Sequence, residues 1–158
     1  MLGLYRAVIK KMGHTRIFAW VGRNLFHPID NILYKLTGGR ILSSGPPILP
    51  TLLLTTTGKR SGKERVSPLL YLKHGDELVV VGSNFGQKHH PAWSENLLAN
   101  PGPRVQVGSH TGKYQARLAK AEEKDTLWPN LLEIWPAYDT YTGRSSRDIR
   151  VFILSPEE

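Results

Sequence analysis

Four cations crowd a short stretch between two apolar segments of the chain. The segment TTTGKRSGKERVSP, residues 55–68, holds Lys59, Arg60, Lys63 and Arg65 around two glycines. Guanidinium forks and ammonium charges suit phosphate and carboxylate oxygens, and glycine lets backbone N–H groups approach a ligand closely. The stretch therefore predicts an anion-binding turn. A solvated hairpin that carries charge for solubility is the alternative.

This basic turn, residues 58–65, is not the phosphate loop of nucleotide-binding proteins. That motif places four residues between its glycines and then a lysine followed by Ser or Thr, whereas here Gly58 and Gly62 enclose three residues and the lysine is followed by glutamate. The chain has no cysteine, which excludes disulfides, thiolate nucleophiles and Cys-based metal sites. The adjacent pair His89–His90 would point in opposite directions in an extended loop, so we expect no metal site.

A second stretch, GSNFGQKHHPAW, follows a valine-rich run and leads into a predicted helix. Its residues 82–90 form a polar loop that contains two glycines, Ser83 and Asn84. A small-polar loop between a strand and a helix N-terminus can bind an anion or the polar edge of a ring through free amides. Many such loops only turn the chain, and it is the pairing with the basic turn that favours a ligand site.

A late aromatic cluster is the third candidate. Trp128, Trp135, Tyr138 and Tyr141 lie close together in the sequence, and the last three, here called the aromatic trio, recur every third residue, which places them roughly on one side of a helical segment. Most aromatic stripes belong to a core, and that is one interpretation. Because the two tyrosines stand among polar residues 139–143, we expect partial exposure and a wall over a planar ligand.

Short apolar segments separated by turn residues predict a mainly antiparallel sheet. They are residues 51–57, 66–73, 77–82, 104–107, 113–119 and 150–154. Residues 91–101 predict a helix between two prolines, and a last helical stretch begins near Glu122 and is interrupted or re-entered at Pro129 and Pro136. We expect an α+β fold whose strands close into a small barrel, because closure removes exposed edges.

The N-terminal region predicts a pair of amphipathic helices, with apolar residues at helical spacing on both sides of Pro28. Residues 43–50, SSGPPILP, read as a linker because paired prolines forbid helical and ladder hydrogen bonds. We divide the chain into a helical segment, residues 1–45, and a barrel, residues 46–158, within one domain. The helices either pack on the barrel or lie on a membrane surface. The oligomeric state is not predicted.

The chain has 21 basic and 13 acidic residues and a formal net charge of +8. A basic protein of this kind favours an anionic partner such as phosphate, an acidic cofactor, nucleic acid or lipid. A protein that reads single strands interleaves exposed aromatic residues with its cations, and residues 58–65 contain none, so we expect no nucleic acid. The absence of cysteine fits a cytoplasmic location, with membrane association left open.

Three motifs, in this order and spacing, resemble the deazaflavin-dependent nitroreductase family of actinobacteria, whose members use the reduced coenzyme F420. They are LLLTTTGKRSGKERVSPLLYL, VVVGSNFGQKHHPAWSENLLANP and WPAYDTY. The similarity runs from Pro50 to the C-terminus. It implies a split β-barrel related to flavin-reductase folds, a cofactor groove, and a reductase of the quinone or nitro type.

The resemblance also implies a set of site residues, with the phosphate and oligoglutamate tail of F420 on the basic turn. The implied cofactor-binding residues are Thr57, Lys59, Arg60, Ser61, Lys63, Arg65, Pro68, Leu69, Gly82, Ser83, Asn84, Gln87 and Lys88. The substrate wall maps to Trp135, Tyr138 and Tyr141, and several relatives have tyrosine in place of Trp135, so the preference for nitro-imidazoles is not carried over. Trp93 and Asn96 are expected to be mainly structural.

The reaction implied is transfer of a hydride from C5 of the reduced deazaflavin to a quinone, a nitroaromatic or another conjugated electron-poor acceptor. The protein would orient the partners and exclude water. Tyr138 is the first candidate for a hydrogen-bond donor to the acceptor oxygen, with Tyr141 and Ser83 as alternatives. Two other functions stay open: the same barrel could hold FMN, or the protein could be a non-catalytic F420 carrier.

Overall fold

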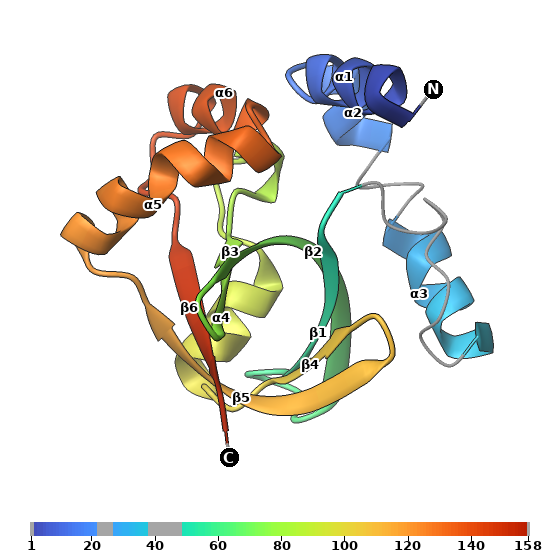
Figure 1. Ribbon diagram of the computed structural model, residues 1–158. Helices are drawn as coiled ribbons and strands as arrows, with labels where there is room; N and C mark the ends of the chain where they lie inside the picture. The colour runs from blue at the N-terminus through green and yellow to red at the C-terminus, as the bar shows by residue number, and fades with distance from the viewer. Residues whose placement is uncertain (1, 22–26, 38–48, 158) are drawn as a thin grey trace.

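Six strands form a closed antiparallel barrel in the order β1-β2-β3-β6-β5-β4 (Figure 1). The structure is a computed structural model that describes residues 2–21, 27–37 and 49–157. The linker predicted for residues 43–50 lies outside them except for its last two positions. The strands are β1 (Thr51–Thr57), β2 (Glu64–His74), β3 (Glu77–Val81), β4 (Arg104–Val107), β5 (His110–Leu118) and β6 (Val151–Pro156). The α+β barrel predicted from the apolar segments is confirmed.

The helices lie where helices were predicted, with two differences: the described N-terminal region holds three helices rather than a pair, and the polar loop contains a short 3-10 helix that was not predicted. They are α1 (Leu2–Met12), α2 (Arg16–Val21), α3 (His27–Thr37), the short 3-10 helix η2 (Asn84–Gly86), α4 (Ala92–Ala99), α5 (Ala121–Ile134) and α6 (Ala137–Arg144). Pro129 stands inside α5 and Pro136 is the N-cap of α6. Pro136 therefore marks the start of a helix as predicted, whereas Pro129 does not end α5. No helix in the described part of the chain is long and apolar enough to cross a membrane.

The barrel interior is the first of two cores. Alternate residues of β1, Leu52 and Leu54, are at most 1% exposed and pack with Phe152 of β6, as expected when side chains point to opposite faces of a strand. Trp93 and Leu97 of α4 pack into the same cluster, and the Trp93 and Phe152 ring centroids are 5.7 Å apart. This packing fixes α4 against the barrel.

The second core lies outside β3 and β6, under α5 and α6 (Figure 1). Val79 and Val81 face it, while Val80 between them faces the barrel interior. Both faces of β3 are therefore buried, which explains why its sequence is a continuous apolar run rather than an alternating one. Leu127 and Leu131 of α5 complete the contact.

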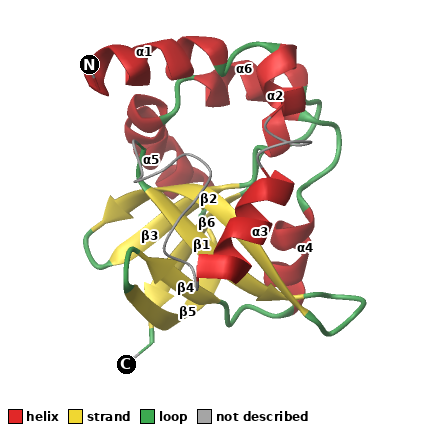
Figure 2. Cartoon of the chain, turned by 90° about the vertical axis from the view of Figure 1, so that its right-hand side faces the viewer, coloured by secondary structure: helices red, strands yellow, loops and turns green. Residues whose placement is uncertain are grey.

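The N-terminal helices take two different places. α1 and α2 lie beside α6 (Figure 1), and α3 lies against the outside of the barrel beside β2 (Figure 2). The bond from Lys10 Nζ to the Glu133 carbonyl and that from the Tyr141 hydroxyl to the Gly13 carbonyl join α1 and the turn after it to α5 and α6. In this structure α1 and α2 thus pack on the C-terminal helices, and α3 packs on the barrel.

Candidate functional site

The basic turn connects β1 to β2 and is closed by its own backbone. The Gly58 amide donates to the Lys63 carbonyl at 2.8 Å, and the Gly62 amide donates to the Gly58 carbonyl at 2.8 Å. Gly62 has φ +66°, a left-handed conformation that glycine adopts without steric cost. The sequence therefore forms a compact turn here because glycine occupies the position that needs it.

A buried asparagine of α4 ties the basic turn to the body of the protein. The Lys59 amide donates to Asn96 Oδ1 at 2.9 Å, and Asn96 Nδ2 donates to the Thr56 hydroxyl at 3.1 Å. Asn96 is 7% exposed and Thr56 is 2% exposed. The structural roles predicted for Asn96 and for Trp93 agree with these contacts. Presentation of the basic turn thus depends on α4.

The side chains of the basic turn point into solvent. Arg60, Lys63 and Arg65 are exposed, and Lys59 forms a long ion pair with Glu95 at 3.8 Å. Among the described residues, neither Arg60 nor Lys63 has an acidic side chain within ion-pair distance. Two cations that are held on a tethered turn and have no acidic partner there suit a phosphate or carboxylate group of a ligand.

The polar loop has an unusual backbone. Asn84 and Phe85 have φ values of 46° and 53°, and Gly86 follows with 73°, so three consecutive residues are left-handed. A Cβ at Gly86 would lie 3.1 Å from the Cα of Tyr141. The loop therefore approaches α6 closely and needs glycine there, which explains the pattern NFG.

Arg147, which the sequence analysis missed, holds the polar loop in place. Its guanidinium donates to the carbonyls of Ser83 at 2.8 Å, Gln87 at 3.0 Å and Gly82 at 3.2 Å, and it contacts His90 Nδ1 at 3.0 Å. No motif around Arg147 marks it, because the three carbonyls that it binds belong to residues 60 to 65 positions away in the sequence. Only the fold reveals this role.

Glu95 of α4 links the surroundings of the two loops. It pairs with Lys59 of the basic turn and, at 2.5 Å, with Arg150, whose carbonyl accepts the Gly82 amide at 2.8 Å. The hydrogen bond from Arg150 holds the pKa of Glu95 below its ordinary value. The basic turn and the polar loop therefore lie on either side of the N-terminal half of α4, joined by one ion network.

The aromatic trio is buried, so the expected partial exposure is wrong for this structure. Trp135, Tyr138 and Tyr141 are 5%, 5% and 1% exposed. The Tyr141 hydroxyl donates to the Gly13 carbonyl at 2.7 Å, and Phe18 lies 5.7 Å from the Trp135 ring. The polar residues around the tyrosines face outward on α6, while α1 and α2 cover the aromatic side.

Burial also changes the acidity of the two phenols. Burial raises the pKa of Tyr138, and the neighbouring Tyr141 raises it further. Burial also raises the pKa of Tyr141. Both hydroxyls therefore keep their protons at neutral pH and can act as donors. Phe85 of the polar loop lies 6.3 Å from the Tyr141 ring, so the loop stands between α4 and the aromatic trio.

The remaining predicted residues border these features. Thr57 is exposed at the end of β1, Pro68 and Leu69 are half-buried in β2, and Lys88 is exposed on the polar loop. Leu69 packs against the barrel core. The structure therefore brings the basic turn, the start of β2 and the polar loop to the region around α4, and it places the aromatic trio beyond the polar loop.

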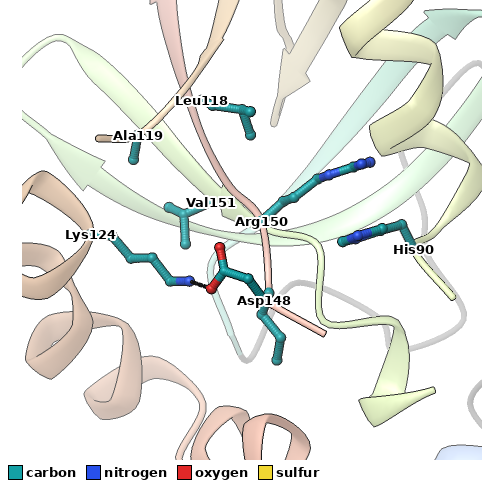
Figure 3. A pocket seen from close by; sticks show the side chains of 8 residues that line it. His90, Leu118, Ala119, Lys124, Asp148, Arg150 and Val151 are labelled. Carbon is teal, nitrogen blue, oxygen red and sulfur yellow. Dashed lines mark hydrogen bonds and ion pairs between the residues drawn. The ribbon is translucent and has the colours of Figure 1, made fainter. Parts of the chain in front are cut away.

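A pocket of about 240 Å³ lies beside this region rather than in it (Figure 3). His90 and Arg150 form one side, and Lys124, paired with Asp148, forms another. Burial, with Arg150 and Arg147 nearby, lowers the pKa of His90. His90, the last residue of the polar loop, lines this pocket, but no residue of the basic turn or of the aromatic trio does, so we assign it no part in the site.

Comparison with known proteins identifies the family of the chain. A family model described as F420H(2)-dependent quinone reductase matches residues 29–156. The F420H(2)-dependent quinone reductase Rv1261c of Mycobacterium tuberculosis is 33% identical over 130 residues, which cover 80% of this chain and 87% of that protein.

Two solved structures share the fold, and about a third of the aligned residues are identical. One is an F420-H2 dependent reductase, FDR-A, with a TM-score of 0.62 and 36% identity, covering 67% of this chain and 94% of that one. The other is described as a domain-swapped dimer, with a TM-score of 0.64 and 32% identity, covering 79% of this chain and 96% of that one. The resemblance stated from the motifs is confirmed, and the chain belongs to the F420H(2)-dependent quinone reductase family, an oxidoreductase family with a split-barrel fold.

Proposed function

We propose that this protein binds F420H2 across the basic turn and the polar loop and reduces a quinone. The observation that carries the proposal is the pair of cations Arg60 and Lys63, which have no acidic partner among the described residues and stand on a turn anchored by Asn96. When bound, the cofactor supplies a hydride from C5 of its deazaflavin ring. The chain supplies binding, orientation and exclusion of water.

The donor set fits this cofactor. Its phosphate and oligoglutamate groups need several cations, and the basic turn offers Lys59, Arg60, Lys63 and Arg65 on one short segment. The polar loop offers half-buried hydroxyl and amide side chains, those of Ser83, Asn84 and Gln87. Together with Gly82, Lys88, Thr57, Ser61, Pro68 and Leu69, these residues are the proposed cofactor-binding set.

For the acceptor, we propose a wall formed by the aromatic trio and a donor among Tyr138, Tyr141 and Ser83. The Tyr141 hydroxyl donates to the Gly13 carbonyl in this structure, so a direct contact with an acceptor requires α1 and α2 to move. Ser83 is half-buried and lies on the polar loop itself. Tyr138→Phe should lower turnover and leave cofactor affinity nearly intact, and unchanged turnover would remove the phenol from the mechanism.

Titration of the deazaflavin fluorescence tests the cofactor proposal. Replacing both Arg60 and Lys63 by Gln should weaken F420 binding at low salt, and added salt should weaken binding to the unmodified protein more than to this variant, because exposed charges are screened. The double variant Lys11→Gln/Lys73→Gln removes the same charge from exposed positions elsewhere. Equal affinities of all three proteins at low salt would refute the role of the basic turn.

The same titration separates the remaining functions. FMN binding tighter than F420 binding would favour a flavin enzyme on the same barrel. Tight F420 binding without turnover across a panel of quinones would favour a carrier. Turnover with nitroaromatic compounds, assayed beside the quinones, tests the wider acceptor range.

We also infer a contact of α1 and α2 with an anionic membrane surface, where lipid-soluble quinones reside. Met12, Ile17 and Trp20 are 49%, 76% and 59% exposed, Lys11 and Arg16 lie beside them, and residues 1–26 contain no acidic residue. Apolar side chains among cations are typical of helices that lie on anionic lipid.

Sedimentation with vesicles tests this contact. We expect binding to vesicles that contain anionic lipid and weaker binding after Ile17→Ser, while Leu98→Ser, at a position 46% exposed on α4, serves as the control. Equal binding to neutral and anionic vesicles, or equal loss in both variants, would contradict the inference.

A further inference from the structure

One arginine forms hydrogen bonds with backbone carbonyls at both the start and the later part of the polar loop. The Arg147 guanidinium reaches three carbonyls, those of Gly82, Ser83 and Gln87, at 2.8–3.2 Å, and an imidazole nitrogen of His90 at 3.0 Å. All of its nitrogens, Nε, Nη1 and Nη2, take part. Since the Nη1 group is a donor, His90 Nδ1 must be the acceptor and carries no proton.

The loop needs such support because its backbone is strained. Asn84 and Phe85 are left-handed at φ 46° and 53°, a conformation that is unfavourable for a non-glycine residue. Apart from Arg147, the loop is closed by the Gly86 and Gln87 amides, which donate to the Ser83 and Asn84 carbonyls, and by Asn84 Nδ2, which donates to the His89 carbonyl. These bonds are internal to the loop, and its first residue is also tied to the segment before β6, because the Gly82 amide donates to the Arg150 carbonyl at 2.8 Å. Arg147 adds the bonds to the carbonyls of Ser83 and Gln87.

Arg147 is itself fixed on the segment between α6 and β6. The Ser145 hydroxyl donates to the Arg147 carbonyl at 3.1 Å, and the Ser145 amide donates to the Tyr141 carbonyl at 3.0 Å. Burial, together with the neighbouring Arg150, lowers the pKa of Arg147, which means that its surroundings disfavour the charged guanidinium. The hydrogen bonds to the loop offset that cost.

We propose that Arg147 is a positioning residue that fixes the polar loop in the conformation that receives the cofactor. The inference rests on the proposed function, because it assumes that Ser83, Asn84 and Gln87 bind F420. A guanidinium can serve these divergent acceptors at once since its five N–H groups lie in one plane. A lysine keeps the charge but presents one nitrogen, so it cannot replace Arg147.

The experiment compares Arg147→Lys and Arg147→Ala with Arg117→Lys as a matched control. Arg117 also uses two guanidinium nitrogens, to Glu123 at 2.8 Å, but it lies outside both loops. We expect both Arg147 variants to raise the F420 dissociation constant about tenfold or more, as the loss of two charge-assisted hydrogen bonds implies. The KM for quinone should change little, and Arg117→Lys should bind F420 as the unmodified protein does.

Two further readouts separate positioning from general stability. Amide exchange should accelerate in residues 82–90 of both Arg147 variants and stay unchanged in the barrel strands. Added methylguanidine should restore F420 binding to Arg147→Ala.

F420 binding by Arg147→Lys within about twofold of the unmodified protein, a difference of about 0.4 kcal/mol, would overturn the inference alone. Failure of the unmodified protein to bind F420 would overturn the proposed function and this inference together.

Discussion

Asn96→Ala should destabilise the protein and loosen the basic turn at the same time. The change removes the acceptor of the Lys59 amide and the donor to the Thr56 hydroxyl. Thr56 is 2% exposed, so water cannot replace the lost donor at that end. Two lost hydrogen bonds, one of them at a buried hydroxyl that keeps only a 3.5 Å bond to the Arg65 carbonyl, should reduce the free energy of unfolding by about 2–3 kcal/mol.

Thermal and denaturant unfolding measure this loss. For a chain of this length we expect the Tm to fall by about 5–10 °C and the urea midpoint to fall without a change in slope. F420 affinity should fall as well, because the turn that carries Arg60 and Lys63 loses its anchor on α4 while its charges remain.

Asn100→Ala is the matched control on the same helix. Asn100 is exposed, and its Nδ2 reaches the Thr57 carbonyl only at 3.5 Å, so its loss should change stability by about 0.5 kcal/mol or less. If Asn96→Ala were no more destabilising than Asn100→Ala, the asparagine would not be the anchor, and the account of how α4 presents the basic turn would fail.

Two further changes test other parts of the structure. A Cβ at Gly13 would lie 2.8 Å from Cη2 of Trp135 and closer still to Cζ2. Gly13→Ala should therefore displace α1 and α2, reduce the free energy of unfolding by about 1–3 kcal/mol and accelerate amide exchange in residues 2–21. Unchanged exchange there would contradict this packing. Hydrogen bonds from Arg117 and from a backbone amide hold the pKa of Glu123 at about 2, below its ordinary value of 4.5. The stabilisation of the fold by this carboxylate is therefore present above about pH 4.5 and is lost as the pH falls towards 2. Glu123→Gln should therefore be less stable than the unmodified protein at pH 7 and equally stable near pH 2, and a difference that does not depend on pH would refute the pairing.

The barrel could be predicted from local sequence because each strand carries its own signal. Residues 51–57 and 104–107 match β1 and β4 without error. β2 starts earlier than predicted, at Glu64, and β5 starts earlier, at His110. The first residues of β2 and β5 carry mostly exposed polar side chains, so the apolar pattern does not include them.

The candidate site was predicted in part, for the same reason. The basic turn and the polar loop are contiguous segments, and glycine with charge or small polar residues marks each of them. The contacts that position them, through Arg147 and Asn96, join residues far apart in the chain. The burial of the aromatic trio likewise depends on α1 and α2, whose place on α6 no local pattern specifies.

The charge distribution bears on the proposed role of the basic turn in cofactor binding. Some exposed cations elsewhere on the described surface have acidic partners: Arg104 pairs with Glu64 and Arg117 with Glu123. Arg60 and Lys63 lie three residues apart on a turn that Asn96 anchors, so their like charges repel each other. A polyanion bound there would remove that repulsion, and binding to the folded state alone raises stability by mass action. Saturating F420 should accordingly raise the Tm of the unmodified protein more than that of the variant in which both cations are replaced by Gln.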